Sequence, residues 1–382
     1  MIMENTLRVK AEISLSDIRH NYAAMRRHYG EGIKILSVLK ADAYGHGISG
    51  IAKTCDALTD YFAVATVEEA GRIRDAGGKK PILLFGPAPV GLIAHAARIG
   101  ITFALPSLDY ARTVQQILKA EGLTACAHLK IDTGMNRVGI RWRDGLEAEA
   151  MAAIEEIYAM DALKITGIYT HLPVSDNYND DDNAFTAEQI RLFRAACDAI
   201  TAKGYDVGIR HCSSTGGSIA HPDDLFDMVR VGMMVYGQCD TLEHTAKIGL
   251  RESLRWVTNV IQVETLRKGE YVSYGRTFRA DHDMTIGTLS CGYADGYRRC
   301  YSQNEVLAGG KRCRILGRIC MDFMIIDLSE VEDPHAGMEV ILLGSQGEEH
   351  ISAIEIAAKN ESTCGEVTAA INQRVPRFYK ED

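Results

Sequence analysis

Eight short runs of apolar and β-branched residues recur through the first 240 positions of this chain of 382 residues. Stretches rich in Ala, Leu and Glu with helical spacing separate several of them, for example at 108–120, 145–160 and 186–202. Strands that alternate with helices form parallel sheets through right-handed βαβ units, and a count of eight favours a closed (β/α)₈ barrel over an open sheet. We expect the barrel strands at 33–39, 61–65, 82–85, 101–104, 127–131, 165–170, 207–211 and 233–236.

The pattern changes after about residue 250. Strand-like runs there are joined by glycine-rich turns with little helix between them, which indicates a separate β domain. The predicted fold class is α/β, with a (β/α)₈ barrel over residues 10–245 followed by a mostly-β domain over 246–382. A further strand within residues 1–14 is expected to join the β domain. The expected strands of this domain are 257–266, 271–274, 284–289, 313–316, 324–328 and 338–343.

Composition excludes several function classes. A net charge of −9 does not favour binding to the phosphate backbone of nucleic acid, so no nucleic-acid partner is expected. Every apolar run is far shorter than the roughly 20 residues that span a bilayer, so no membrane association is expected. The 10 cysteines contain no C-x-x-C pair, which favours reduced thiols in a cytoplasmic protein over a disulfide framework or a metal site.

Lys40 ends the first expected strand, within Val38-Leu-Lys-Ala-Asp-Ala-Tyr-Gly-His-Gly47. Functional residues of barrels lie at the carboxyl ends of the strands, and a desolvated lysine there can form a Schiff base with an aldehyde. Residues 45–50 also match the G-x-G-x-x-G pattern of dinucleotide-binding folds. In those folds the first glycine follows the strand almost directly, whereas five residues intervene here, so this alternative is the weaker one.

Other strand ends carry polar residues too. Arg137, in a glycine-bearing loop, is suited to bidentate binding of a carboxylate. His171 and His211 close the sixth and seventh expected strands. Hydroxyls and glycine amides at 213–217, with a second loop at 230–233, predict a phosphate site, because barrels commonly bind phosphate with the loops after strands seven and eight.

Together, the segments 38–47, 132–137, 211–217 and 374–377 resemble the alanine racemase family of pyridoxal-phosphate enzymes. Members of this family have a barrel followed by a β domain. The resemblance implies that Lys40 holds pyridoxal 5′-phosphate as a Schiff base and that Arg230 faces the pyridine nitrogen. The other cofactor-binding residues would be Tyr44, His171, His211, Ser214, Thr215, Gly232 and Met233.

The same resemblance implies a homodimer with shared active sites. Arg137 would hold the substrate carboxylate, oriented by Lys130, a lysine that is often carbamylated in this family. The β domain of the partner subunit would supply the remaining contacts. These residues are Tyr274, Tyr293, Met321 and Asp322.

Racemisation needs a proton removed from one face of Cα and returned on the other, so two acid/base groups must flank it. The resemblance implies Lys40 for one face and Tyr274 of the partner subunit for the other. A tyrosine with its usual pKa near ~10 is a poor base at neutral pH unless cations stabilise its phenolate. His171 and Arg137 are the expected sources of that help.

Three departures from the family pattern concern the substrate. The phosphate loop reads Ser214-Thr215, residues 172–176 read Leu-Pro-Val-Ser-Asp, and Gln373 precedes the last Arg-Val-Pro-Arg where the family usually has a tyrosine beside the substrate. Serine racemases linked to vancomycin resistance resemble the chain at the first and third of these sites. We therefore expect alanine racemisation with additional activity on serine, supplying D-amino acid for peptidoglycan precursors.

Three alternatives remain from the residues. Serine could be the main substrate. A decarboxylase of the same architecture is a second possibility, although the nearest match to its Cys-Asp segment, Cys239-Asp240, lacks the usual context. A non-catalytic pyridoxal-phosphate carrier is the third, but such carriers are single barrels without a β domain.

Overall fold

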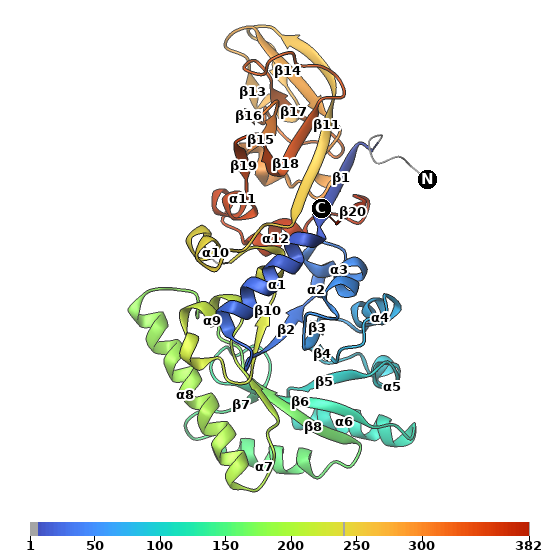
Figure 1. Cartoon of the computed structure of the whole chain (residues 1–382), viewed down its shortest axis with the longest axis vertical. Helices are drawn as coiled ribbons and strands as arrows, with labels where there is room; N and C mark the ends of the chain where they lie inside the picture. Colours follow the sequence, from blue (N-terminus) through green and yellow to red (C-terminus); the bar gives the residue numbers. More distant parts are fainter. Residues whose placement is uncertain (1–6, 240, 382) are drawn as a thin grey trace.

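A computed structural model describes residues 7–239 and 241–381, which form a barrel of strands and helices and a β domain (Figure 1). The barrel occupies one end of the molecule and the β domain the other, with helices α2, α3, α10 and α12 near the junction.

The barrel consists of parallel strands whose residues are mostly buried. Such strands have both faces covered, which explains their continuous apolar runs. The first and last strands also pair, and the backbone of Asp227 and Arg230 donates to Arg210 and Ser213 at 3.0 Å each, which nearly closes the barrel. The predicted fold class is confirmed. In spatial order the strands are β10 (Met228–Val231), β2 (Lys34–Val38), β3 (Tyr61–Val64), β4 (Ile82–Leu84), β5 (Ile101–Leu105), β6 (Ala125–Asp132), β8 (Leu163–Tyr169) and β9 (Ile209–His211).

The eighth expected strand, 233–236, is wrong. Those residues form the 3₁₀ helix η4 (Met233–Tyr236), and the eighth strand is β10, directly before it. The charged Arg230 interrupts the apolar run of β10 in the sequence. In the structure Arg230 is only 4% exposed and lies within the barrel, so its charge does not mark a surface position.

The helices surround the barrel strands (Figure 1). The expected helix 108–120 coincides with α6, and 145–160 contains α7. Helix α8 begins six residues before the expected 186, because Asn179 caps its N-terminus and three aspartates occupy its first turn, where the helix dipole favours negative charge. The helices are α1 (Leu15–Tyr29), α3 (Ile48–Cys55), α4 (Val67–Asp75), α5 (Ile93–Arg98), α6 (Leu108–Ala120), α7 (Glu147–Tyr158), α8 (Asp180–Ala202), α9 (Thr215–Ala220) and α10 (Leu242–Ile248).

The chain leaves β2 through an unusual turn, α2 (Lys40–Tyr44). Residues 41–44 all have positive φ, between 50° and 55°, although none is glycine. Glu69 accepts a hydrogen bond from the amide of Ala41, and Asp42 accepts one from Ile48. The nearby G-x-G-x-x-G match serves packing: a Cβ on Gly47 or Gly50 would lie about 2 Å from the Tyr379 ring or hydroxyl.

Both ends of the described chain enter the sheet of the β domain. Strand β1 (Val9–Ser14) is antiparallel to β11 (Leu254–Leu266) and parallel to β20 (Arg377–Lys380). The sequence prediction missed two short helices, α11 (Ala353–Lys359) and α12 (Cys364–Ala369), and four strands. The missed strands are β13 (Phe278–Arg279), β15 (Glu305–Ala308), β19 (Glu349–Ile351) and β20. The other elements are β12 (Tyr271–Val272), η5 (Tyr274–Arg276), β14 (Met284–Leu289), η6 (Tyr293–Asp295), η7 (Arg299–Gln303), β16 (Lys311–Arg314), β17 (Met324–Asp327) and β18 (Glu339–Gln346).

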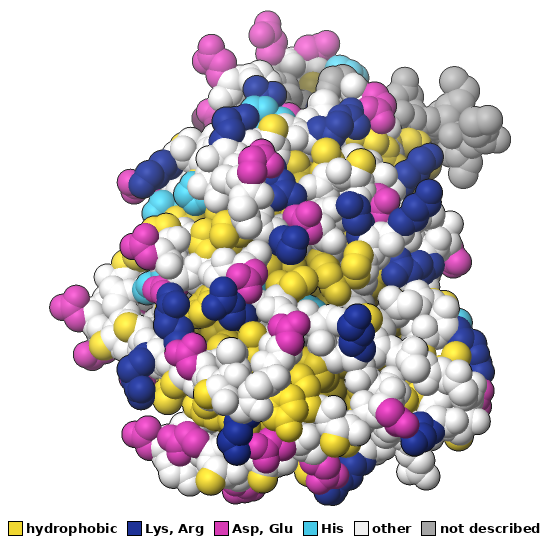
Figure 2. Space-filling view, turned by 60° about the horizontal axis from the view of Figure 1, so that its bottom comes forward, with side chains coloured by type: hydrophobic (Ala, Val, Ile, Leu, Met, Phe, Trp, Pro, Cys, Tyr) yellow, Lys and Arg dark blue, Asp and Glu magenta, His cyan; other side chains and the backbone are white. Residues whose placement is uncertain are grey.

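Acidic and basic side chains are interspersed over the face shown in Figure 2, without a large region of one sign. Within 7–239 and 241–381 there is no helix both long and apolar enough to cross a bilayer. The same residues contain no group of three or more His, Cys, Asp or Glu side chains arranged to hold a metal ion.

Candidate active site

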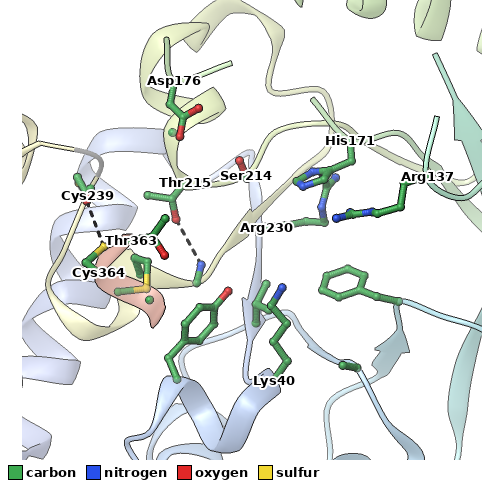
Figure 3. Close-up of a pocket in the computed structure, with 18 of the residues that line it drawn as sticks. Lys40, Arg137, His171, Asp176, Ser214, Thr215, Arg230, Cys239, Thr363 and Cys364 are labelled. Atoms are coloured by element: carbon green, nitrogen blue, oxygen red, sulfur yellow. Dashed lines mark hydrogen bonds between the residues drawn. The ribbon is translucent and has the colours of Figure 1, made fainter. Parts of the chain in front are cut away.

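A cavity of about 1070 Å³ opens at the carboxyl ends of the barrel strands. Figure 3 shows Lys40, Arg137, His171 and Arg230 converging on it from different strands and loops. The structure brings together most of the residues predicted for the barrel half of the site. Those that line the cavity are Lys40, Tyr44, Lys130, Arg137, His171, Ser214, Thr215, Arg230, Gly232 and Met233.

The amine of Lys40 has the properties expected of a nucleophile. Its pKa is lowered, chiefly by desolvation and next by the positive charge of Arg137, while Glu69 opposes the shift. Its Nζ lies 6.0 Å from the ring centre of Tyr44. A larger fraction of neutral amine favours bond formation with an aldehyde.

Polar groups suited to a phosphate gather at one end of the cavity. Thr215 accepts a hydrogen bond from the amide of Gly232 at 3.3 Å, and the Ser214 and Thr215 side chains lie together in Figure 3. A Cβ placed on Gly232 would lie 2.8 Å from the Tyr44 hydroxyl. Glycine is therefore required for the backbone to approach this hydroxyl, and the hydroxyls and backbone amides match the acceptor oxygens of a phosphate.

Arg230 is held by several acceptors. Its guanidinium donates to Nδ1 of His211 and Nδ1 of His171, both at 3.1 Å, and to the carbonyls of Thr170 and Cys212 at 3.0 and 2.6 Å. These bonds fix its orientation in the cavity. A pyridine nitrogen facing it would meet only a donor, because arginine has no acceptor to offer.

Both histidines beside Arg230 are neutral. Burial and the nearby charge of Arg230 hold the pKa of His171 and of His211 well below the usual range. The lowered pKa favours a neutral His171 that gives a hydrogen bond, which leaves Arg137 as the cation of the expected pair.

The sequence prediction missed His128, which extends this set. Nδ1 of His128 lies 3.0 Å from Nε2 of His211. Because His211 accepts from Arg230 through Nδ1, its proton is on Nε2 and points to His128. His128 lies two residues before Lys130 on β6 and thus faces the same side of the strand, a signal that was available from the sequence.

Lys130 is a buried amine that forms no salt bridge within 4 Å among the described residues, although the buried carboxylate of Asp132 is near enough to favour its charged form. It is 5% exposed, lies 4.8 Å from the ring centre of Tyr169 and donates to the carbonyl of Ile131. Desolvation, followed by the charges of Arg230 and Arg137, lowers its pKa to about 7. A substantial fraction is therefore a neutral, nucleophilic amine at neutral pH.

The β domain lines the cavity with residues that the sequence prediction did not include. They come from α11, α12 and the segment between them, and Gly365 lies against Tyr44 and Met233. A Cβ on Gly365 would lie 3.2 Å from the Tyr44 ring and 3.3 Å from Sδ of Met233. The set is Ile354, Ala357, Ala358, Ser362, Thr363, Cys364 and Gly365.

Gln373 does not lie in this cavity. It is exposed and lines a separate hollow of about 530 Å³ with Asp42 and Arg72. The cavity of the same chain therefore does not include the expected contact of Gln373 with the substrate, and this contact stays a prediction. The chain turns between α12 and β20, which carries Gln373 past the cavity and places Gly365 against it instead.

The other residues predicted for the β domain lie outside the cavity and are exposed. Tyr274 is 69% exposed, Met321 53% and Tyr293 39%. Large apolar side chains are seldom left this exposed in a cluster on a monomer. Asp322 neighbours Met321 and is 44% exposed at its side chain.

Two sequence models of one family match most of the chain. The N-terminal domain of alanine racemase matches residues 13–240, and the C-terminal domain matches residues 253–379. The chain belongs to the alanine racemase family. The resemblance drawn from the motifs is thereby confirmed.

Individual relatives agree along the whole length. The chain is 35% identical over 372 residues to alanine racemase 2 of Caldanaerobacter subterraneus, covering 97% of this chain and 94% of that one. It is 35% identical over 375 residues to alanine racemase 1 of Bacillus subtilis, covering 97% and 93%.

Solved structures show the same fold. The alanine racemase of Clostridium difficile superposes with a TM-score of 0.91 at 31% identity, covering 99% of this chain and 97% of that one. A Bacillus anthracis alanine racemase with bound L-Ala-P gives a TM-score of 0.90 at 29% identity, covering 98% and 95%. Members of the family depend on pyridoxal phosphate, and this protein is an isomerase with that cofactor.

Proposed function

We propose that the protein interconverts L- and D-alanine, with serine as a second substrate. The observation that carries the proposal is one cavity that holds a lysine of lowered pKa, two arginines and a loop whose hydroxyls and amides suit a phosphate. The relatives are named as alanine racemases, and on this family membership we propose that the protein supplies D-amino acid for peptidoglycan precursors in the cytoplasm.

Pyridoxal phosphate, when bound, withdraws electrons from Cα of an attached amino acid and so makes its proton acidic. Lys40 would hold the cofactor, and Tyr44, Ser214, Thr215 and the amides near Gly232 would hold its phosphate. Arg230, fixed by His171, His211 and two carbonyls, would donate to the pyridine nitrogen without protonating it. This weaker electron withdrawal favours prompt return of the proton to Cα.

The two sides of Cα require two bases. Lys40, once displaced by the substrate, would move the proton on one face. Tyr274 of the partner subunit would move it on the other, with Arg137 holding the substrate carboxylate and stabilising the phenolate. The high exposure of Tyr274 and Met321, away from the cavity of their own chain, supports a homodimer with shared sites.

Lys130 would orient Arg137 after its neutral amine nitrogen forms a bond to the carbon of carbon dioxide and releases a proton, which gives a carbamate. The neutral amine expected for a pKa of about 7 is the form that reacts. A carbamate would replace a buried partial positive charge with a negative one between Arg137 and Arg230, both of which lower the pKa of Lys130. The electrostatic cost of burying the amine would then become a favourable interaction.

Activity on serine is supported by the phosphate loop, which reads Ser214-Thr215 and resembles that of serine racemases at this site. An apolar pocket rejects an added hydroxyl only weakly, by roughly 10²-fold. Serine as the main substrate is the second candidate.

The test is a set of assays with purified holoenzyme. L-Ala and L-Ser should both invert, with higher kcat/KM for L-Ala. Lys40→Ala should abolish both inversion and the visible absorption of the lysine-bound cofactor. Persistence of that absorption in Lys40→Ala, or absence of inversion of any amino acid by the parent protein, would contradict the proposal.

A further inference from the structure

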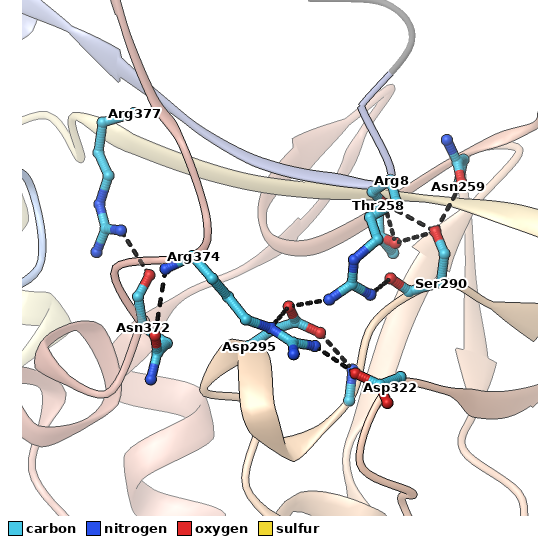
Figure 4. Close-up of polar contacts among 10 residues, drawn as sticks. Arg8, Thr258, Asn259, Ser290, Asp295, Asp322, Asn372, Arg374 and Arg377 are labelled. Carbon is cyan, nitrogen blue, oxygen red and sulfur yellow. Dashed lines mark hydrogen bonds and ion pairs between the residues drawn. The ribbon is translucent and has the colours of Figure 1, made fainter.

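A buried carboxylate lies at the centre of a cluster of charged groups in the β domain, which Figure 4 shows. We call Arg8, Asp295, Asp322 and Arg374 the Asp295 cluster. Asp295 is 0% exposed, and its Oδ1 accepts from Arg8 at 2.5 Å and from Arg374 at 2.7 Å. Its Oδ2 accepts from the amide of Gly292 at 2.9 Å, so the charge is fully compensated.

Arg374 differs from Arg8 because it has a second carboxylate partner. While its Nε binds Asp295, its Nη2 donates to Asp322 at 2.6 Å. Arg8 instead gives its other donor to the carbonyl of Ser290. One planar guanidinium therefore joins the η6 loop to the loop around residues 320–322, a geometry that a lysine cannot reproduce.

Backbone hydrogen bonds also connect the two loops. Tyr293 and Ala294 donate to the carbonyls of Cys320 and Met321, at 3.0 Å each. A Cβ on Gly292 would lie 2.4 Å from both of these carbonyl oxygens, so only glycine permits the approach. The segment of Arg374 is attached as well, because the amide of Asn372 donates to the carbonyl of Asp295 at 2.9 Å.

The loops joined in this way carry Tyr293, Met321 and Asp322, three of the residues proposed to reach the partner's active site. Asp295 ends the same short helix that Tyr293 begins. Arg374 is thus the side chain that sets the spacing between the two groups of exposed contacts. Its own chain's cavity contains no atom of it.

We infer that Arg374 is a positioning residue for the active site of the other subunit. It acts by bridging Asp295 and Asp322, and so holds the Tyr293 loop and the Met321 loop in the relative position that substrate binding requires. This inference rests on the shared-site homodimer of the proposed function. Loss of the bridge in one subunit should impair substrate binding in the barrel of the other subunit, an effect that a purely structural role would not have.

The homodimers give the first readout. Arg374→Ala should lower kcat/KM for alanine by about 10- to 100-fold, mostly through a higher KM, because misplacement of binding groups by about 1 Å has effects of this size. Arg374→Lys should recover part of the loss. Arg8→Ala is the matched control: it loses an ion pair to the same Asp295 oxygen but leaves the bridge, so its KM should stay within about twofold of the parent's.

Mixed dimers, purified through two different affinity tags, give the decisive readout. The first mixed dimer combines one Lys40→Ala chain with one Arg374→Ala chain. Its only barrel with Lys40 is completed by the β domain that retains Arg374, so we expect half the parent's activity with the parent's KM. In a dimer of parent with the double variant Lys40→Ala/Arg374→Ala, the one working barrel meets the altered β domain, so KM should be raised.

The reverse pattern, or an unchanged KM in the Arg374→Ala homodimer, would overturn the inference. A mixed dimer of Lys40→Ala with Tyr274→Phe tests the shared site separately and should recover half the activity. If this last dimer stays inactive while the Arg374→Ala homodimer shows the raised KM, the shared-site proposal is wrong. If Arg374→Ala does not fold, Arg374→Lys replaces it in the same mixed dimers.

Discussion

At the scale of single residues, buried neutral histidine rings hold Arg230 in the cavity. Arg230 donates to His211, whose Nε2 faces Nδ1 of His128, so each histidine has one defined tautomer. The far nitrogen of His128 is buried without a hydrogen-bond partner among the described residues. Burial lowers the pKa of His128 to about 3, so this row of rings carries no charge in the physiological range and orients Arg230 by geometry alone.

Lys130 provides a prediction about pH. Its pKa of about 7 in the folded protein lies below the usual value of 10.5, so the unfolded chain binds more protons between these values. Unfolding free energy should therefore rise with pH in this window, by up to about 1.4 kcal/mol per unit relative to Lys130→Met. Denaturant titrations at pH 7, 8 and 9 in carbonate-free buffer measure it. If the unfolding free energies of the parent and of Lys130→Met changed equally with pH, the amine of Lys130 would not titrate as expected. Added bicarbonate should reduce the pH dependence of the unfolding free energy of the parent.

Gln373 and Gly365, eight positions apart in the chain, give two different predictions. Gln373→Tyr should leave the ratio of kcat/KM for L-Ala and L-Ser within about twofold, because the side chain lies outside the cavity. Gly365→Ala should weaken binding of the cofactor, since its new Cβ presses on Tyr44 and Met233 at 3.2–3.3 Å. Assays with L-Ala and L-Ser check the prediction for Gln373→Tyr, and equilibrium binding of pyridoxal phosphate checks the prediction for Gly365→Ala. A changed ratio in Gln373→Tyr would return that residue to the site.

Among the elements, the turn after Lys40 is the most constrained. Four consecutive non-glycine residues with left-handed φ are rare, because each costs roughly 1–2 kcal/mol. The turn is held by Glu69, which accepts from the amides of Ala41 and Ala65 and completes the capping box of α4. The strain is located next to the nucleophilic amine, where it fixes the direction in which Lys40 leaves β2.

Relief of this strain is measurable. Ala41 is exposed, so Ala41→Gly removes no packing and should stabilise the protein by about 1 kcal/mol. The control is Ala152→Gly, at an exposed position of the right-handed α7, which should destabilise it by about 1 kcal/mol. Chemical denaturation gives both values. Equal destabilisation by both substitutions would show that the turn is not strained.

In the whole molecule the two domains are linked at several points. Strand β1 belongs to the sheet of the β domain while α1, which follows it directly, packs on the barrel. Tyr379 on β20 donates to the carbonyls of His46 and Gly47 behind the Lys40 turn. A rigid connection of this kind would deliver the partner-directed residues of one β domain at a constant distance from its own barrel.

The proposed shared sites make activity depend on subunit concentration. Specific activity should fall on dilution below the dissociation constant of the dimer, in step with the dimer fraction measured by sedimentation. A chemically cross-linked dimer is the control and should keep its activity. Constant specific activity in a fully monomeric sample would show that one chain completes its own site.

The sequence by itself determined the barrel, the β domain and the strand-end residues of the cavity. These depend on local periodicity and on the rule that parallel strands end at one edge, which are visible along the chain. The eighth strand escaped this reasoning because Arg230 is a buried charge, and burial of a charge depends on acceptors from other strands.

Only the tertiary structure decided which segments far apart in the chain meet. It placed Gly365 at the cavity and Gln373 outside it, although only eight positions separate them. It also joined Arg8, Asp295, Asp322 and Arg374, which are scattered over nearly the whole chain. Such contacts arise from the packing of two domains and from the loss of water around charges, which no local pattern of residues encodes.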